Sequence, residues 1–262
     1  MLLHDDKTKP LRRFFIPPEM IGADTPEITG SGAGHICRVL RLTAGDEVEL
    51  FDGSGNGYRA EIESANSIRV RFTIVASYPL ATESPARITL AQSFLKERKM
   101  DDLIRPLTEL GIHCWRPFPA ARSVARPKRQ SLEKRLERWH KKALEAVKQC
   151  RRGRIPAIEP ADSLTEILAT SDGFDLKLFF WEGKPLSTDI FAGSRSSPQS
   201  ILAVVGPEGG FTSDEAEMAQ SNGFLICGLG PRILRAQTAA IAACTVVQCR
   251  FGDMGMAVND NP

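Results

Sequence analysis

Three short segments of the chain combine glycine with charged or hydroxyl side chains, and each one follows a run of apolar residues. They are Trp181-Glu-Gly183, Gly206-Pro-Glu-Gly-Gly-Phe-Thr212 and Leu229-Gly-Pro-Arg-Ile-Leu-Arg-Ala-Gln-Thr-Ala239. Glycine permits positive φ and a close approach of the backbone, so such loops can hydrogen-bond a flat ligand through main-chain groups. Each loop taken alone is typical of an ordinary turn, so the prediction of a binding site rests on the three together.

The glycine loops do not have the spacing of the common nucleotide-binding motifs. Neither the dinucleotide motif G-x-G-x-x-G nor the P-loop motif G-x-x-x-x-G-K-[ST] occurs in them. The loops therefore give no support to a nicotinamide-dependent enzyme or an NTPase. The six cysteines form no C-x-x-C pair and the four histidines are not clustered, so we expect no metal site.

Apolar runs before these loops predict an α/β domain with a mainly parallel sheet over residues 81–252. The runs at 176–181 and 201–205 are typical of buried parallel strands, and 87–92 and 225–227 read as further strands. In open α/β sheets ligands bind at the carboxyl ends of the strands. The three loops are therefore expected to meet at that edge.

Helices are predicted between these strands. Apolar residues recur every three or four positions in 100–110 and in 132–150, and Pro106 is expected to kink the first helix or to delay its start. Thr212-Ser-Asp-Glu215 is a capping box that opens a helix. The alanine-rich stretch 236–249 is apolar on nearly every face, which predicts a buried helix.

Residues 1–80 have a different pattern, with glycine turns and no helical period, which predicts a small β-barrel or sandwich. Polar and apolar residues alternate in 46–51, 58–63 and 67–75, and the first two runs are separated by the turn sequence Asp52-Gly-Ser-Gly-Asn-Gly. Residues 79–85 contain two prolines and are expected to be a linker. Residues 253–262 are expected to be a loose tail.

Charge is strongly segregated along the chain despite a net charge of only +2. Residues 87–154 contain 19 Lys and Arg against 7 Asp and Glu, whereas the segments on either side are both acidic. Charge runs are often solvated helix faces, but residues 116–154 have 14 basic residues and only 3 acidic ones, too few for mutual pairing. We therefore favour a polyanion partner, and in particular nucleic acid.

Length and composition indicate a soluble globular protein. The chain has 262 residues, of which 42% are hydrophobic and 25% charged, and no stretch approaches 18 uninterrupted apolar residues. The first seven residues include two acids, which is unlike a signal peptide. Cysteines among apolar neighbours suit reduced thiols, so a cytoplasmic location is expected.

The strings Ala203-Val-Val-Gly-Pro-Glu-Gly-Gly-Phe-Thr-Ser-Asp-Glu215 and Leu229-Gly-Pro-Arg-Ile-Leu-Arg-Ala-Gln-Thr-Ala239 resemble the ribosomal RNA small subunit methyltransferase E family, which belongs to the knotted (SPOUT) methyltransferases. The resemblance extends over nearly the whole chain. It includes Arg12-Arg-Phe-Phe-Ile and His35-Ile-Cys-Arg-Val-Leu-Arg41 near the start, and Lys99-Met100, Glu109-Leu-Gly-Ile112 and Glu145-Ala-Val-Lys-Gln-Cys-Arg-Arg-Gly-Arg-Ile-Pro156 in the centre.

This resemblance implies a PUA-like RNA-binding β-barrel over residues 1–80 and a trefoil-knotted α/β methyltransferase domain over 81–252. It also implies a homodimer that binds S-adenosyl-L-methionine in the knot and methylates N3 of one uridine in small-subunit (16S) ribosomal RNA, free or in the 30S particle. Its motifs assign the following residues to the cofactor: Glu182, Gly206, Pro207, Glu208, Gly209, Leu229, Gly230, Ile233, Leu234, Thr238 and Ala239. Outside the family context, Glu208 is typical of an exposed turn and Thr238 of an ordinary helix residue.

Arg235 and Arg232 are the candidate catalytic residues. Loss of the uracil N3 proton leaves an anion, which a nearby cation stabilises. Pairing of either arginine with an acid of a helix is an equally good expectation, because guanidinium binds carboxylates as well as phosphates. Gln237 stands where the family commonly has an acid, and an amide cannot act as a base although it can position one by hydrogen bonding.

RNA binding is assigned to a set of basic residues that occur in or near the matched motifs: Arg12, Arg13, Arg38, Lys96, Lys99, Arg122, Arg152 and Arg154. The central block also departs from the family, because Arg105-Pro106 stands where Gln-Lys is usual and Ala121 where an acid is usual. The target base must be unpaired or flipped out to expose its N3 edge.

Two other functions remain open at this stage. A related knotted enzyme would methylate a ribose 2′-oxygen or another base nitrogen. An RNA-binding or ribosome assembly factor without catalysis would keep the RNA affinity and lose the cofactor, and Gln237 is the feature that favours it.

Overall fold

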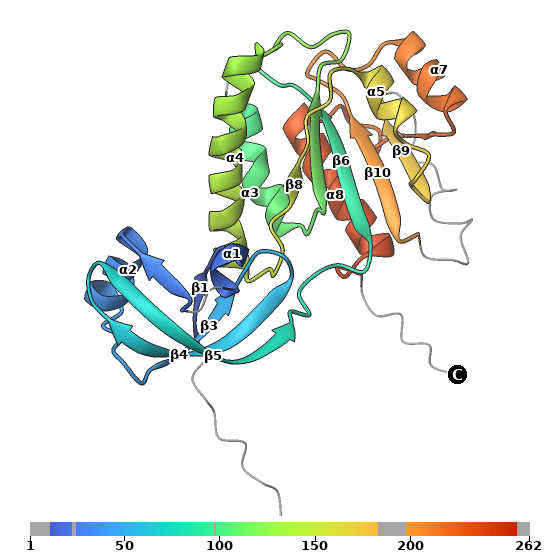
Figure 1. Cartoon of the computed structure of the whole chain (residues 1–262). Coiled ribbons are helices and arrows are strands. Elements are labelled where there is room, and N and C mark those ends of the chain that lie inside the picture. Colours follow the sequence, from blue (N-terminus) through green and yellow to red (C-terminus); the bar gives the residue numbers. More distant parts are fainter. Residues whose placement is uncertain (1–10, 23–24, 97, 183–197, 256–262) are drawn as a thin grey trace, which may run out of the picture. The chain divides into compact units, whose positions relative to one another are not determined.

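The computed structural model describes residues 11–22, 25–96, 98–182 and 198–255 (Figure 1). The chain forms two compact units. The first consists of Met1–Glu83 together with Lys148–Arg154, and the second of Ser84–Val147 together with Ile155–Pro262. The chain therefore returns to the first unit at residues 148–154, which a single division near residue 80 does not include.

The first unit is built on a curled five-stranded sheet (Figure 1). Its strands are β1 (Arg12–Phe15), β2 (Glu27–Thr29), β3 (Glu47–Phe51), β4 (Asn56–Ala65) and β5 (Arg69–Pro79). They lie in the order β1-β3-β4-β5-β2, in which β1 and β3 are parallel and the other pairs antiparallel. The alternating sequence correctly predicted β3, β4 and β5, because alternate side chains such as Val48 and Leu50 enter the core.

The first unit also contains short helices, which the sequence pattern did not identify. It contains α1 (Pro18–Ile21), α2 (Ser31–Gly34) and the π-helix η1 (His35–Val39). Each is five residues or shorter, which is too short for an apolar repeat of 3.6 residues to be recognised. Ala33 and Ile36 nevertheless pack into the core of the sheet.

The returning segment Lys148–Arg154 is fixed inside the first unit by buried polar contacts. The guanidinium of Arg152 is 2.7 Å from a carboxylate oxygen of Glu83, and the same carboxylate accepts hydrogen bonds from the amides of Gly153 and Arg154. Arg13 donates to the carbonyl oxygen of Arg152 at 2.8 Å.

The second unit contains a six-stranded sheet in which every pairing is parallel, as predicted. Its strands are β6 (Arg87–Ser93), β7 (Cys114–Phe118), β8 (Ala157–Ile158), β9 (Leu176–Phe180), β10 (Ser200–Val205) and β11 (Leu225–Cys227), in the order β11-β9-β10-β6-β7-β8. The chain runs outward from β6 to β8, then crosses to the other side of β6. The carboxyl ends of β6, β9 and β10 therefore lie next to one another at the point where the strand order reverses.

Helices cover both faces of this sheet (Figure 1). They are α3 (Lys99–Glu109), α4 (Arg129–Cys150), α5 (Leu164–Ala169), α7 (Ser213–Ser221) and α8 (Ala236–Phe251). Strand β10 shows how the two faces are filled. Ile201 and Ala203 pack in the cluster that contains α3, α4 and α8, whereas Leu202 and Val204 pack in the cluster that contains α5 and α7.

Two helices differ from their predictions. Helix α3 begins at Lys99 and continues through Pro106, so the prediction of a delayed start was wrong. Helix α8 is not buried on every side, since Thr238 and Cys249 are exposed while Ala240 and Cys244 are fully buried. The capping box of α7 is confirmed, because Thr212 and Glu215 exchange hydrogen bonds between side chain and backbone.

No described helix is long and apolar enough to cross a membrane. In the same described ranges, no group of three or more His, Cys, Asp or Glu side chains is placed to hold a metal ion. All six cysteines lie in the described ranges, and no disulfide joins any two of them. Burial raises the pKa of Cys114, Cys227 and Cys244 to about 12, so these three thiols are uncharged at neutral pH.

Candidate functional site

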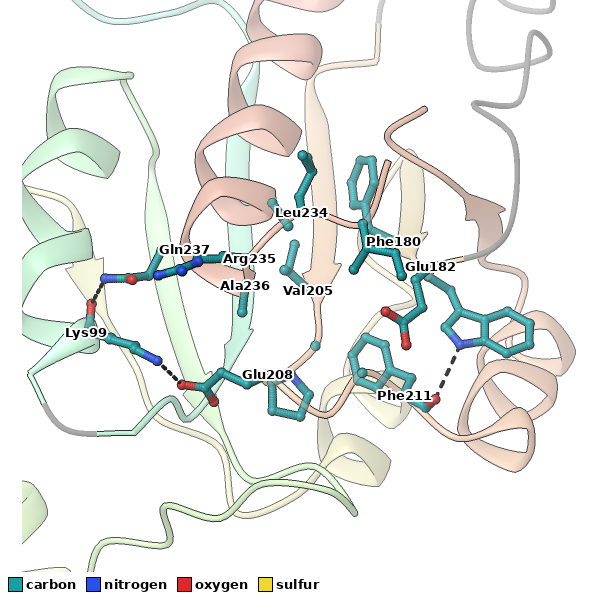
Figure 2. A pocket seen from close by; sticks show the side chains of 16 residues that line it. Lys99, Phe180, Glu182, Val205, Glu208, Phe211, Leu234, Arg235, Ala236 and Gln237 are labelled. Carbon is teal, nitrogen blue, oxygen red and sulfur yellow. Dashed lines mark hydrogen bonds and ion pairs between the residues drawn. The ribbon is translucent and has the colours of Figure 1, made fainter. Parts of the chain in front are cut away.

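The three glycine-containing segments meet around one cavity in the second unit, at the carboxyl ends of its strands (Figure 2). The cavity has a volume of about 380 Å³, within the range of small-molecule sites. Its lining includes Lys99, Phe180, Trp181, Glu182, Val205, Gly206, Pro207, Glu208, Gly210, Phe211, Ile233, Leu234, Arg235, Ala236, Gln237 and Ala239. Apolar walls with a few charged groups at the edge suit a ligand with a flat ring and a polar chain.

Side chains from neighbouring elements hold the backbone of the 206–212 loop. The buried side chain of Gln92, in β6, donates to the carbonyl oxygen of Gly206 at 3.0 Å. Arg122 donates to the carbonyl oxygens of Gly209 and Phe211 at 3.1 and 3.4 Å, and the indole of Trp181 donates to Phe211 at 3.3 Å. The loop is therefore anchored along its length.

Glycine is required at Gly210 by both conformation and space. Its φ is +67°, and a Cβ there would lie 2.5 Å from a carboxylate oxygen of Glu182. Gly206 has a related constraint, since a Cβ would lie 3.1 Å from the ring of Phe211. The backbone thus forms a cradle with no side chain of its own, and the Glu182 carboxylate lies against it (Figure 2).

A line of polar contacts crosses one side of the cavity (Figure 2). The ammonium of Lys99 is 3.0 Å from Glu208, the amide of Lys96 donates to the same carboxylate at 3.1 Å, and the side-chain amide of Gln237 donates to the carbonyl oxygen of Lys99 at 3.3 Å. Burial opposes the charge of Glu208, but hydrogen bonds from Lys99 and backbone amides outweigh it and lower the pKa of the carboxyl. Glu208 is therefore ionised at neutral pH.

Arg235 contributes an unpaired positive charge to the lining. It is the N-cap residue of α8 and is exposed. Within the described ranges its guanidinium forms no ion pair and no hydrogen bond, in contrast to Lys99. Arg232 lies outside the lining, so the structure brings only one of the two predicted catalytic arginines to the cavity.

Most of the predicted cofactor residues line the cavity, and the remainder do not. Glu182, Gly206, Pro207, Glu208, Ile233, Leu234 and Ala239 line it. Gly209, Leu229, Gly230 and Thr238 belong to the same segments but are not in the lining. Gly183, the last residue of the first segment, lies outside the described residues.

Sequence reasoning missed the apolar wall of the cavity. Phe180, Val205 and Phe211 line it, as does Ala236 at the start of α8. The first two are the last residues of β9 and β10, so their places at strand ends were a usable signal. Lys99 was predicted to bind RNA, but it lines the cavity.

The other predicted RNA-binding residues fall into two groups. Arg12, Arg38, Lys96 and Arg154 are exposed. Arg13 and Arg152 have side chains only 10% and 5% exposed, paired with Glu49 and Glu83, and Arg122 holds the 206–212 loop. The guanidinium groups of this second set are thus engaged within the protein.

Comparison with known proteins gives a consistent picture. Residues 82–248 match the family model of an RNA methyltransferase domain, and residues 28–75 match that of an RNA methyltransferase PUA domain. The ribosomal RNA small subunit methyltransferase E of Bacillus subtilis is 33% identical over 245 residues, which cover 90% of this chain and 96% of that protein.

Two solved structures are similar over nearly their whole length. A methyltransferase from Legionella pneumophila, in complex with the cofactor SAM, has a TM-score of 0.80 at 29% identity, covering 94% of this chain and 100% of that one. A ribosomal RNA small subunit methyltransferase E from Neisseria gonorrhoeae, bound to S-adenosyl methionine, has a TM-score of 0.76 at 29% identity, covering 93% and 99%.

Proposed function

Because the chain belongs to the ribosomal RNA small subunit methyltransferase E family, we propose that it transfers the methyl group of S-adenosylmethionine to N3 of a uridine in small-subunit ribosomal RNA. The observation that carries the proposal is the guanidinium of Arg235, which has no partner among the described residues and lies at a cavity whose backbone is anchored by Gln92, Arg122 and Trp181.

The cavity fits the cofactor on two observations. The side-chain-free backbone at Gly206 and Gly210 leaves room for a flat ring against the main chain, with Phe180 and Phe211 as apolar walls. Glu182 and Glu208 supply carboxylates that suit hydroxyl and ammonium groups. When bound, S-adenosylmethionine supplies a methyl group on a sulfonium centre.

The protein's own contribution to the reaction is alignment and charge. Methyl transfer requires the acceptor nitrogen to approach in line, so a rigid loop supports the rate through orientation. Uracil N3–H is weakly acidic, and loss of its proton to solvent places negative charge on the ring. Arg235 stabilises that charge because its guanidinium has no competing partner in the part of the chain that the structure describes.

Glu208 is better suited to binding than to proton removal. Its pKa is below the ordinary value because, despite burial, it accepts hydrogen bonds from Lys99 and Lys96. A carboxylate with a lowered pKa is a weak base. Gln237 cannot accept the proton as a base either, and its amide instead holds the backbone of Lys99.

The family also supports several features of organisation that belong to this proposal. We expect a trefoil knot around the cofactor site, a homodimer, a cytoplasmic location, and RNA contacts from the exposed set Arg12, Arg38, Lys96 and Arg154. The domain assignment remains residues 1–80 as the RNA-binding PUA-like domain and 81–252 as the methyltransferase domain, with 148–154 packed in the first unit.

The test is methyl transfer from labelled S-adenosylmethionine to small ribosomal subunits that lack their own methylation, followed by digestion and mass spectrometry of the nucleosides. The proposal predicts labelled 3-methyluridine. A labelled 2′-O-methyl nucleoside or another methylated base would move the chain to a different branch of knotted enzymes. Absence of both transfer and cofactor binding by calorimetry would make it an RNA-binding factor.

A further inference from the structure

Two arginines of the first unit have a backbone conformation that favours glycine. Arg41 and Arg151 have φ values of 56° and 63°, and no other non-glycine residue in the described ranges has a positive φ. In this left-handed region a Cβ approaches the following carbonyl oxygen, so every residue with a side chain is disfavoured relative to glycine.

The second unit shows what the chain places at such positions elsewhere. Gly111 follows the last turn of α3 with φ +78°, and Gly223 follows α7 with φ +80°. In each case the next amide bonds back into the helix, from Ile112 to Leu107 and from Phe224 to Ala219. This is the usual glycine-containing helix end.

In the first unit Arg41 occupies the position that corresponds to Gly111 and Gly223, and Arg151 lies one residue nearer the end of its helix. Arg41 follows the C-cap residue Leu40 of η1, and the amide of Leu42 bonds back to the carbonyl oxygen of Ile36 at 3.1 Å. Arg151 directly follows the last residue of α4. The same backbone requirement is thus met by a residue that carries a long cationic side chain.

Neither side chain is used to stabilise the fold. Arg41 and Arg151 are exposed, and in the described part of the chain neither forms an ion pair or a side-chain hydrogen bond. Arg13 of the same unit differs, because its guanidinium is paired with Glu49 and stacked on Phe51 at 4.0 Å. Burial chiefly lowers the pKa of Arg13, and the positive charge of Arg151 lowers it further, so Arg151 adds repulsion as well as backbone strain.

Each of the two arginines also has an exposed arginine three residues away. Arg38 precedes Arg41, and Arg154 follows Arg151. Guanidinium binds phosphate through two parallel hydrogen bonds, and phosphate contacts fix the register of a protein on nucleic acid. A side chain that leaves from a fixed helix end loses less conformational freedom on binding than one from a loose loop.

We propose that Arg41 and Arg151 are phosphate contacts for the RNA substrate, kept in left-handed backbone positions because the side chain is needed for binding. The inference rests on the proposed function, which supplies the RNA partner, and adds two residues that the matched motifs did not single out for RNA. Outliers of backbone conformation that do not stabilise the fold are typical of functional positions.

The test compares Arg41→Gly and Arg151→Gly in the full-length chain by thermal unfolding and by binding to unmethylated small-subunit ribosomal RNA transcribed in vitro. Each variant should keep or raise the melting temperature, because glycine suits the backbone. Each should weaken RNA binding about fivefold and reduce the slope of log K against log salt by about 0.7–0.9. The double variant should weaken RNA binding by about the product of the fold-changes of the two single variants.

Two controls separate the side chain from the backbone and from net charge. Arg41→Ala removes the guanidinium but keeps a Cβ. It should bind RNA as weakly as Arg41→Gly does, and its melting temperature should be lower than that of Arg41→Gly. Arg59→Gln removes one positive charge from the same unit at a residue paired with Glu47, and should change RNA affinity by less than about twofold.

A lower melting temperature for the glycine variants would overturn the inference, because the side chains would then be structural. Unchanged RNA affinity and salt dependence would overturn it as well, as would failure of the wild-type chain to bind this RNA. Wild-type protein that binds the RNA through these arginines but forms no 3-methyluridine would contradict the proposed function alone.

Discussion

The 206–212 loop and the segment 228–235 both border the cavity, but neighbouring side chains anchor only the first. Gln92, Arg122 and Trp181 all donate hydrogen bonds to carbonyl oxygens of the loop. In the described part of the chain no side chain hydrogen-bonds to the backbone of 228–235, and Ile233 is 83% exposed.

This difference separates two tasks that a methyl-transfer site must perform. A cofactor is bound well by a preformed surface, whereas a flipped base has to enter and leave. The anchored loop suits the first task. The segment that ends at Arg235 presents an exposed cation in the cavity lining, with no partner among the described residues, which suits contact with the substrate.

Replacement of Arg235 by alanine tests the segment 228–235 and should have the largest effect. The rate constant for methyl transfer at saturating cofactor should fall on the order of 100-fold, because stabilisation of the uracil anion is lost. Arg235→Lys should recover part of the lost rate, since lysine keeps the positive charge but lacks the planar guanidinium with its paired N–H donors. Arg232→Ala is the matched control and should remain within about threefold; an equal loss there would assign the effect to charge in general.

Gly210→Ala tests the anchored loop. A Cβ at φ +67°, against the Glu182 carboxylate, should lower the free energy of unfolding by about 1–2 kcal/mol, or the melting temperature by roughly 2–8 °C. Cofactor affinity should fall as Glu182 is displaced. Gly173→Ala, where no atom lies within 4 Å of the added Cβ, should leave both quantities unchanged. Equal melting temperatures for the two variants would show that the loop is not constrained.

Glu208→Gln tests the ion pair with Lys99 through its pH dependence. The pKa of Glu208 is lowered in the folded state, so its ionisation stabilises the fold above the unfolded-state pKa of about 4.3, and this contribution is lost as the pH falls through the folded value. At pH 7 the free energy of unfolding, measured in urea, should be about 0.5–1 kcal/mol higher for the wild type than for the variant. The difference should be constant down to about pH 5 and shrink below it. A difference in the free energy of unfolding that grows as the pH falls below 5 would contradict this prediction.

Gln237→Glu should have the smallest effect. A carboxylate cannot donate to the carbonyl oxygen of Lys99, so about 0.5 kcal/mol of stability should be lost, with a transfer rate within about threefold of wild type. Urea unfolding of the variant and of wild type measures the loss of stability, and a methyl-transfer assay measures the rate. A rate increase of more than tenfold would show that an acid at this position acts as the base.

Much of the fold could be predicted from the sequence because its signals are periodic. Alternation identified β3–β5, and the recurrence of Leu132, Leu136 and Trp139 identified α4. The two-residue strand β8 and the short helices α2 and η1 carry too few residues for a period. Their formation depends on tertiary contacts that no local pattern encodes.

The cavity was partly predictable for a related reason. Glycine and charge marked the three segments, and their positions after strands placed them at one edge of the sheet. The partners of individual cations could not be predicted, because an arginine that holds a loop has the same local sequence character as one that binds phosphate. Arg122 and Arg235 are the example, since only the structure shows which guanidinium is engaged.

The most direct test of this division compares Arg122→Ala with Arg235→Ala in one experiment. Calorimetry gives the Kd for S-adenosylmethionine, and single-turnover transfer to unmethylated small subunits gives the rate constant at saturating cofactor. We predict that Arg122→Ala raises the Kd about three- to tenfold with little change in the rate constant, and that Arg235→Ala does the reverse. If both variants alter the same one of these two quantities, the two sides of the cavity do not have separate tasks.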